Sequence, residues 1–209
     1  MKKLLAFALV AMMAGVSFGA WGFYDVDRSW VVLDDGDGAA GYSLWDSGAG
    51  TFQGADLGTF DLTMDSFTLT GIDTKTFKNG ASDVTGVEYF YTIYTGARPG
   101  TPVFTSLGGG FLQDYGSGNQ QWGATGLTVD LLAGLSAGTS YTLEIYGMIT
   151  GNDDGNPQNN YNQYDNNNNA PANYTATFDT APAAIPEPAT MSLLGLGALA
   201  MVLRRKISK

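Results

Sequence analysis

The segment from Gly86 to Thr95, GVEYFYTIYT, decides the fold class of this chain. Its apolar and polar side chains alternate with a period of two, the pattern of a β-strand whose two faces meet different surroundings. One face carries Val87, Tyr89, Tyr91 and Ile93. The other carries Glu88, Phe90, Thr92 and Tyr94. Both faces hold aromatic rings, so the strand predicts a sheet with a buried inner side and a partly aromatic outer side.

A second strand of the same kind is predicted from Ser140 to Thr150, with the sequence SYTLEIYGMIT. Its core-facing residues are Tyr141, Leu143, Ile145 and Ile149, opposite Thr142, Glu144, Tyr146 and Met148. If the two strands are neighbours, one sheet surface holds Glu88, Glu144, Phe90, Tyr94, Tyr146 and Met148. That surface would be either an aromatic platform or a second buried layer.

The remaining body alternates in the same way and is interrupted often by Gly, Asn and Asp. Further strands are predicted at Ser29 to Leu33, Phe60 to Met64, Ser66 to Thr70, Thr74 to Lys78, Pro102 to Leu107, Leu127 to Leu131 and Asn173 to Asp179. Asn79-Gly80 favours a tight hairpin, and Gly134 and Gly138 favour turns. We expect one all-β domain over residues 20–180, an antiparallel two-sheet sandwich of jelly-roll kind, with a closed barrel less favoured.

The N-terminus has the features of a secretory signal peptide. Lys2 and Lys3 precede the apolar stretch from Leu4 to Met13, and small residues follow. Residues 1–19 are therefore predicted to be a signal helix that is removed after Gly19, which sends the mature chain out of the cytoplasm.

The sequence of the C-terminus predicts a second targeting signal. Residues 181–188 form a Pro-rich linker that includes Pro186, Glu187 and Pro188, and residues 189–209 form an apolar helix with a basic end at Arg204, Arg205 and Lys206. The apolar run from Ala189 to Leu203 would span roughly 22 Å as a helix, against about 30 Å of hydrocarbon, which makes it a marginal transmembrane anchor. The basic residues would stay cytoplasmic and act as a membrane stop.

This tail, over residues 185–209, resembles the PEP-CTERM sorting signal of Gram-negative bacteria. The resemblance implies export, transient insertion into the inner membrane, and processing by an exosortase near Pro186-Glu187-Pro188. It also implies a final place at the cell surface or outside the cell, in the exopolysaccharide of a biofilm matrix.

The body, over roughly residues 50–180, resembles an accessory β-sandwich module of large exported bacterial proteins. The residues that carry the likeness are Thr76-Phe77-Lys78-Asn79-Gly80, Asp83-Val84-Thr85-Gly86, Gln121-Trp122, Asp130-Leu131-Leu132-Ala133-Gly134-Leu135, Gly138, Tyr141-Thr142-Leu143-Glu144 and Asn173-Tyr174-Thr175-Ala176-Thr177-Phe178. These motifs are strand and turn patterns, so the resemblance implies a fold and no activity.

Charge and composition exclude several classes of function. Between the two terminal signals, four basic residues (Arg28, Lys75, Lys78 and Arg98) face nineteen acidic ones, a net charge of −15 that repels nucleic acid and favours divalent cations or neutral sugars. The chain has no Cys, so its stability does not come from disulfides. It has no His, which excludes Ser-His-Asp and Cys-His nucleophiles and the usual zinc sites.

Two acidic loops are candidate calcium sites, because calcium takes hard oxygen ligands. The first loop holds Asp34, Asp35 and Asp37, and the second holds Asp153 and Asp154. Neither matches an EF-hand loop. Ordinary solvated turns are the alternative interpretation, and in that case the chain has no cofactor.

Aromatic residues outside the two clearest strands are candidate sugar-stacking positions, above all Trp45, Trp122 and Tyr115, with Tyr161 and Tyr164 behind them. The alternative is that these rings fill the core of the sandwich. The Asn-rich stretch from Gln158 to Asn169 is predicted to be a solvated loop.

A glycosidase would need two carboxyl groups about 5 to 10 Å apart, one with a raised pKa. Glu88 and Glu144 are the only pair that we nominate, and this is the weakest hypothesis. We expect a non-enzymatic exported surface or matrix protein without catalytic residues, with a carbohydrate-binding module as the alternative.

Overall fold

The computed structural model describes residues 20–24, 29–44, 50–167 and 173–183, and almost all of its regular structure is β. The strands are β1 (Trp21–Phe23), β2 (Ser29–Asp34), β3 (Ala39–Ser43), β4 (Asp56–Phe60), β5 (Thr68–Lys78), β6 (Asp83–Tyr94), β7 (Thr105–Gly116), β8 (Asn119–Asp130), β9 (Ser140–Asn152), β10 (Tyr161–Asp165) and β11 (Tyr174–Thr180). A 3₁₀ turn, η1 (Pro157–Asn159), precedes β10. The prediction of an all-β domain is confirmed.

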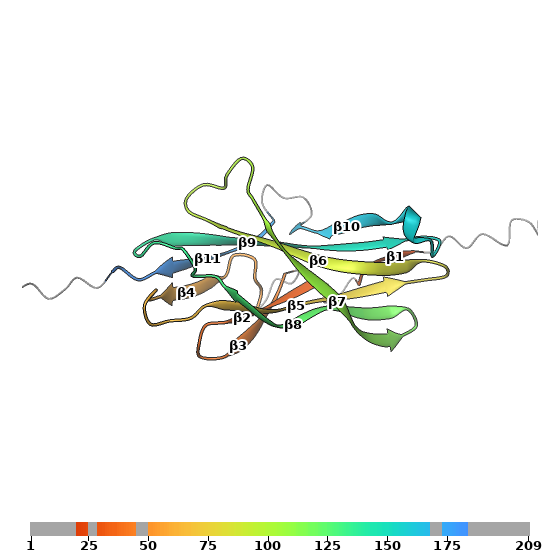
Figure 1. Cartoon of the computed structure of the whole chain (residues 1–209), viewed down its shortest axis with the longest axis horizontal. Helices are drawn as coiled ribbons and strands as arrows, with labels where there is room; N and C mark the ends of the chain where they lie inside the picture. Colours follow the sequence, from red (N-terminus) through yellow and green to blue (C-terminus); the bar gives the residue numbers. More distant parts are fainter. Residues whose placement is uncertain (1–19, 25–28, 45–49, 168–172, 184–209) are drawn as a thin grey trace, which may run out of the picture.

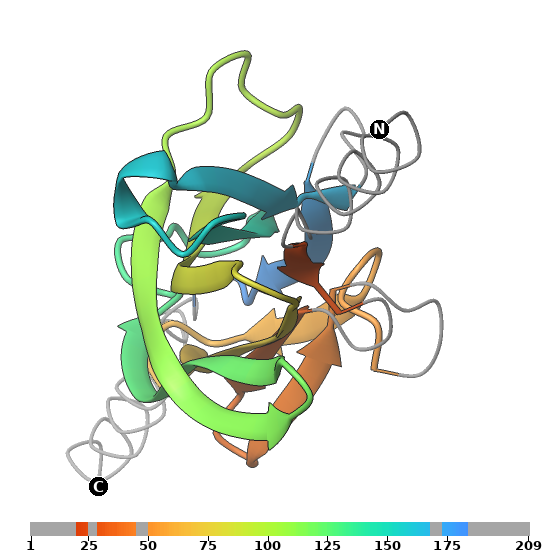
Figure 2. The same cartoon turned by 90° about the vertical axis from the view of Figure 1, so that its right-hand side faces the viewer.

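The strands form two layers that are halves of one curled sheet (Figures 1 and 2). Hydrogen-bonded neighbours follow the order β3-β2-β5-β8-β7-β6-β9-β11-β4, while β1 pairs with β5 and β10 pairs with β9. The first layer contains β1, β2, β3, β5 and β8, and the second contains β4, β6, β9, β10 and β11. The predicted sandwich therefore has a continuous backbone connection along one side.

Strand β7 makes that connection. Its first part, Thr105 to Gly109, pairs with β6, and its second part, from Gly110 onward, pairs with β8. Three consecutive glycines lie where the strand changes layers. A Cβ on Gly109 would lie 2.6 Å from Val87 Cγ1 and 3.0 Å from the backbone of Gly123, so the two layers approach too closely there for any side chain.

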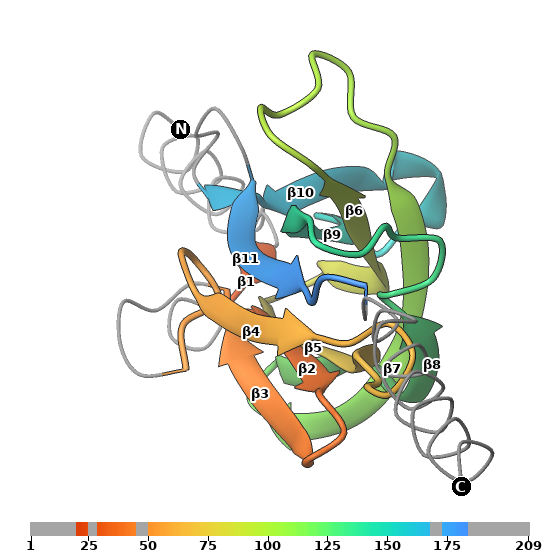
Figure 3. The same cartoon turned by 90° about the vertical axis from the view of Figure 1, so that its left-hand side faces the viewer.

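The opposite side is connected by the segment that leads into β4 (Figure 3). The amide of Phe52 donates to the carbonyl of Ser43 at 2.8 Å, and the amide of Gly54 donates to the carbonyl of Thr175 at 2.7 Å. Strand β4 then pairs with β11 in parallel, so the sheet is mixed and not purely antiparallel as predicted. The reason is that the long connection after β3 crosses from one layer to the other before β4 begins.

The core between the layers is aromatic at one end. Phe60 and Phe67 stack with ring centroids 4.4 Å apart, and Phe178 meets Phe67 edge-on at 5.3 Å. All three side chains are buried. Phe60 and Phe178 belong to β4 and β11, while Phe67 precedes β5, so this contact fastens the two layers together.

The two predicted strands Ser66 to Thr70 and Thr74 to Lys78 are one strand, β5, whose register shifts between Leu69 and Gly71. The predicted strand Phe60 to Met64 is wrong after Phe60, because the Asp61 carboxylate accepts hydrogen bonds from the amide and hydroxyl of Thr63 and closes a turn.

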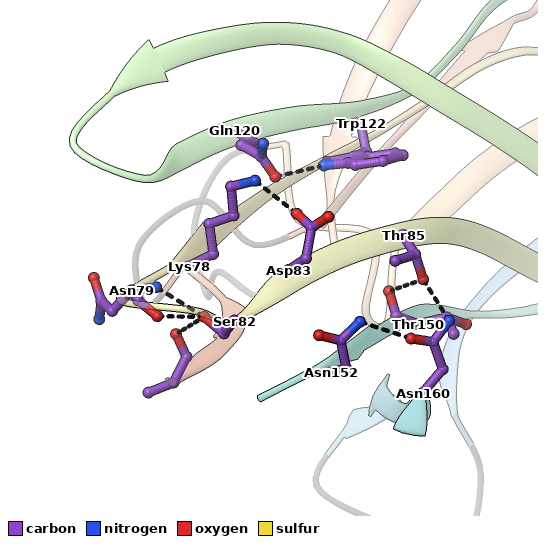
Figure 4. A network of polar contacts seen from close by, with 11 residues as sticks. Lys78, Asn79, Ser82, Asp83, Thr85, Gln120, Trp122, Thr150, Asn152 and Asn160 are labelled. Atoms are coloured by element: carbon purple, nitrogen blue, oxygen red, sulfur yellow. Dashed lines mark hydrogen bonds and ion pairs between the residues drawn. The ribbon is translucent and has the colours of Figure 1, made fainter. Parts of the chain in front are cut away.

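Asn79 and Gly80 do lie in a turn, with Gly80 at a φ of 60°. The turn does not form a hairpin, because β5 and β6 pair with other strands and belong to different layers. Ser82 holds it by accepting from the Asn79 amide at 3.0 Å, and Lys78 pairs with Asp83 at 2.6 Å (Figure 4).

The long β7–β8 hairpin and strand β10 were not predicted over most of their length. Strand β10 lies inside the Asn-rich stretch that was expected to be a loop, and its five residues pair with β9 from Gly151 to Gly147. Its last residue, Asp165, is buried and accepts a hydrogen bond of 2.5 Å from the Tyr174 hydroxyl.

The predicted signal helix, the Pro-Glu-Pro segment and the C-terminal helix lie outside the described residues. Within residues 20–24, 29–44, 50–167 and 173–183, no helix is long and apolar enough to cross a lipid bilayer. The first described strand, β1, and the C-terminal end of β11 lie at opposite ends of the long axis of the domain (Figure 1).

Candidate functional site

The outer surface of β6 and β9 is the shared face that the sequence predicts. The two strands pair antiparallel, with Glu88 opposite Met148, Phe90 opposite Tyr146 and Thr92 opposite Glu144. Directly paired residues point to the same side of a sheet. The inner partners Val87, Tyr89, Leu143, Ile145 and Ile149 are all buried in the core.

Four aromatic rings gather on this face, and we call them the outer aromatic cluster: Phe90, Phe104, Tyr146 and Tyr164. Phe90 and Tyr146 stack with centroids 4.7 Å apart and planes at 12°. Phe104 meets Tyr146 edge-on at 5.1 Å, and Tyr164 of β10 lies 6.4 Å from it. Phe104 comes from the loop between β6 and β7, which projects above the sheet (Figure 2).

Glu144 lies at the foot of the same loop and is completely buried. The guanidinium of Arg98 donates two hydrogen bonds of 2.8 Å to its carboxylate, and the side-chain amide of Asn173 donates a third at 2.7 Å. Burial opposes ionisation of this carboxyl, but the hydrogen bonds and charge of Arg98, with those from Asn173, outweigh it and hold the pKa of Glu144 below its usual value. Glu144 is therefore a structural anion.

This arrangement does not support Glu88 and Glu144 as a glycosidase pair. Their paired positions are four residues apart along the strands, or roughly 13 Å at the usual rise per residue, beyond the separation that such enzymes use. A general acid also needs a raised pKa, and that of Glu144 is lowered.

Tyr115 and Trp122, two of the three principal sugar-stacking candidates, do not share a face. Trp122 pairs with the fully buried Thr74 and therefore lies on the inner side of its layer. Its ring meets the half-exposed ring of Phe111 edge-on at 5.5 Å. Tyr115 is half exposed, and its hydroxyl donates to Gln121, which lies on the opposite side of β8 from Trp122. Trp45 lies outside the described residues.

The acidic loops form turns closed by their own carboxylates. Asp34 accepts from the Gly36 amide at 2.9 Å, Asp35 from the Asp37 amide at 3.1 Å, and Asp154 from the Asn156 amide at 3.0 Å. Asp153 accepts from the Tyr161 hydroxyl at 3.1 Å. In the part of the chain that the structure describes, no three acidic side chains come together as a metal site would require.

Sequence reasoning missed Arg98 and Asn173, which complete the Glu144 site. A signal for Arg98 was present, because a glutamate on a strand that is covered on both sides needs a cation, and the body has only four basic residues. No comparable signal marks Asn173, since it meets Glu144 only after β11 has paired with β9.

Comparison with known families finds a match at the C-terminal end of the chain. Residues 184–206 match the PEP-CTERM protein-sorting motif, and the matched range includes Pro186, Glu187, Pro188 and the basic residues Arg204, Arg205 and Lys206. The chain carries a PEP-CTERM sorting motif. No curated protein matches the sequence.

The PEP-CTERM motif supports an exported protein that is anchored transiently at the membrane and sorted by an exosortase. It confirms the resemblance inferred from the tail. The motif covers 184–206 and so gives no information on the activity of the β domain that precedes it.

Proposed function

We propose that the β domain is a non-enzymatic component of the cell surface or of the exopolysaccharide matrix, delivered there by its sorting motif. The match at residues 184–206 is the observation that carries this proposal. The signal peptide expected at residues 1–19 would begin the export, and the C-terminal helix would hold the protein until an exosortase releases it.

The chemistry of the domain supports a structural role. The body is strongly acidic and lacks both Cys and His. The buried carboxylate of Glu144 accepts hydrogen bonds from Arg98 and Asn173, so it has a structural role in the domain. An acidic, hydrated surface keeps a protein soluble within a polymer matrix.

The test is to express the full chain in a producing strain beside a variant that lacks residues 184–206. We expect the full chain to reach the surface or matrix fraction with its C-terminal basic residues removed, as mass spectrometry of the released form would show. The shortened variant should leave the cell without being retained. Recovery of released protein that still ends in Lys209 would contradict processing at the motif.

A carbohydrate-binding module is the second candidate function. The observation in its favour is that exposed aromatic side chains occur on both layers: Phe111 and Tyr115 on β7, and Tyr161 and Tyr164 on β10. Sugar rings stack on such surfaces when they are rigid and half apolar.

A further inference from the structure

A pocket of about 250 Å³ lies where β1, β5, β7 and β8 meet at one end of the first layer. It is lined by Tyr24, Lys75, Thr76, Tyr115, Asn119 and Gln120. Tyr24 comes directly after β1, and its amide donates to the carbonyl of Lys75 at 3.0 Å, which fixes the chain against β5. Asn119 and Tyr115 flank the tight turn that joins β7 to β8.

Strand register divides the residues that line this pocket into an inner pair and an outer group. Thr76 pairs with Gln120, and both are buried, so this pair faces inward. The adjacent pair of Lys75 and Gln121 must then face outward. The hydroxyl of Tyr115 donates to Gln121 Oε1 at 2.6 Å, which brings the Tyr115 ring to this outer side.

The Tyr115 position is fixed by a chain of polar contacts and not by burial. Gln121 accepts from Tyr115 and in turn donates through its Nε2 to the carboxylate of Asp73 on β5. Tyr115 is 50 % exposed and Tyr24 is 39 % exposed. Two exposed aromatic residues therefore border the pocket, and the hydrogen bond to Gln121 holds Tyr115 in place.

The pocket has the chemistry of a small saccharide subsite. Aromatic rings offer apolar faces, while Lys75 and Asn119 bring an ammonium group and an amide to the same opening. The volume is below the roughly 300 to 1,000 Å³ of sites for drug-sized ligands, which suits a single sugar ring. The body as a whole is strongly acidic, which disfavours acidic sugars by repulsion.

We propose that the pocket between Tyr24 and Tyr115 binds one neutral pyranose ring of a polysaccharide, with the two tyrosine rings against the sugar and Lys75 and Asn119 hydrogen-bonded to its hydroxyl groups. This site rests on the proposed matrix function and gives it a ligand. It also separates Tyr115 from Trp122, which faces the interior.

Native affinity electrophoresis of the full chain in a mild detergent tests the site. The gels contain dextran, mannan, xyloglucan or galactomannan as neutral probes, and alginate as the acidic probe. We expect at least one neutral polymer to retard the protein, with the apparent affinity reduced at least tenfold in Tyr115→Ala and in Tyr24→Ala. Tyr115→Trp should keep the retardation, because it keeps an aromatic face.

Val103→Ala is the control, because Val103 is 85 % exposed but lies in the loop between β6 and β7, away from the residues that line the pocket. It should bind like the unmodified chain, and equal melting temperatures would show that all variants are folded. Absence of retardation in every neutral gel, retardation by alginate alone, or full binding by Tyr115→Ala would each overturn the site. The matrix proposal would survive these results if the sorting experiment still placed the protein at the surface.

Discussion

Arg98 and Glu144 are 46 positions apart in the sequence, yet the guanidinium of Arg98 donates a hydrogen bond of 2.8 Å to each carboxylate oxygen of Glu144. The contact ties the loop between β6 and β7 to the middle strand of the second layer. Because Glu144 has no exposed surface, its charge depends on Arg98 and Asn173 for compensation. The projecting loop is thus held at its base.

Replacing Arg98 by Met should destabilise the domain. The change leaves a buried carboxylate without its cation, and breaking such a pair costs about 3 to 5 kcal/mol when both partners are buried. Arg98 is 31 % exposed, so we expect about 2 kcal/mol, measured by urea unfolding. Lys78→Met is the control: both side chains of the Lys78–Asp83 pair are partly exposed, at 32 % and 44 %, so its loss leaves no fully buried charge and should cost under about 1 kcal/mol. Equal losses in the two variants would contradict the anchoring role of Arg98.

The same carboxylate makes stability depend on pH. The pKa of Glu144 is lower in the folded protein than its ordinary value of 4.5, so its contribution is complete above about pH 4.5 and disappears as the pH falls through the folded pKa. The difference in unfolding free energy between the unmodified chain and Glu144→Gln should therefore shrink on acidification. Urea titrations from pH 7 to pH 3 would measure it, and a difference that stays constant with pH would argue against an ionised Glu144.

Gly109→Ala should disrupt the strand that joins the layers. The new methyl group would lie 2.6 Å from Val87 Cγ1 and 3.0 Å from the Gly123 backbone, and overpacking of this kind typically costs about 1 to 3 kcal/mol. Gly110→Ala is the matched control, because a Cβ there meets nothing within 4 Å. We expect thermal melts to show a clear loss for the first variant and almost none for the second. The reverse order would mean that the layers do not meet closely at Gly109.

Calcium should leave the melting temperature unchanged. The carboxylates of Asp34, Asp35 and Asp154 already accept backbone amides within their own turns. A ligand that binds only the folded state raises the unfolding free energy by RT ln(1 + [L]/Kd), so a thermal scan with millimolar calcium against one with a chelator decides the question. A rise of several degrees with calcium, absent with magnesium, would restore the acidic loops as metal sites.

The faces of β6 and β9 could be predicted from sequence because each strand has one buried side. Tyr89 and Leu143 mark that side in the sequence, and the alternation then fixes every neighbour. The surroundings of the residues on the outer side could not be predicted in the same way. Glu88 and Glu144 look equivalent along their strands, and only the loop that brings Arg98 and the pairing of β11 that brings Asn173 distinguish them.

The remaining strands could not be predicted because their sequences are rich in Gly and Asn. The residues Gly108 to Gly110 have no side-chain pattern, and they are strand because β6 and β8 offer backbone partners on either side. Strand β10 is likewise recruited by the free edge of β9, which needs amides and carbonyls but no apolar side chains. The pocket at Tyr24 could not be predicted from the sequence either. Strand β1 is only three residues long, and its position depends on backbone pairing with β5.

The placement of β1 and the end of β11 at opposite ends of the long axis has a consequence for a tethered protein. Strand β8 runs from Asn119, in the Tyr24 pocket, to Asp130, beside the loop whose Ser136 carbonyl accepts from Thr180 at 2.7 Å. Twelve strand residues span roughly 35 Å. The sorting motif follows β11, so anchoring through it would leave the pocket at the far end of the domain, about that distance from the last strand residue, where an extracellular polymer can reach it.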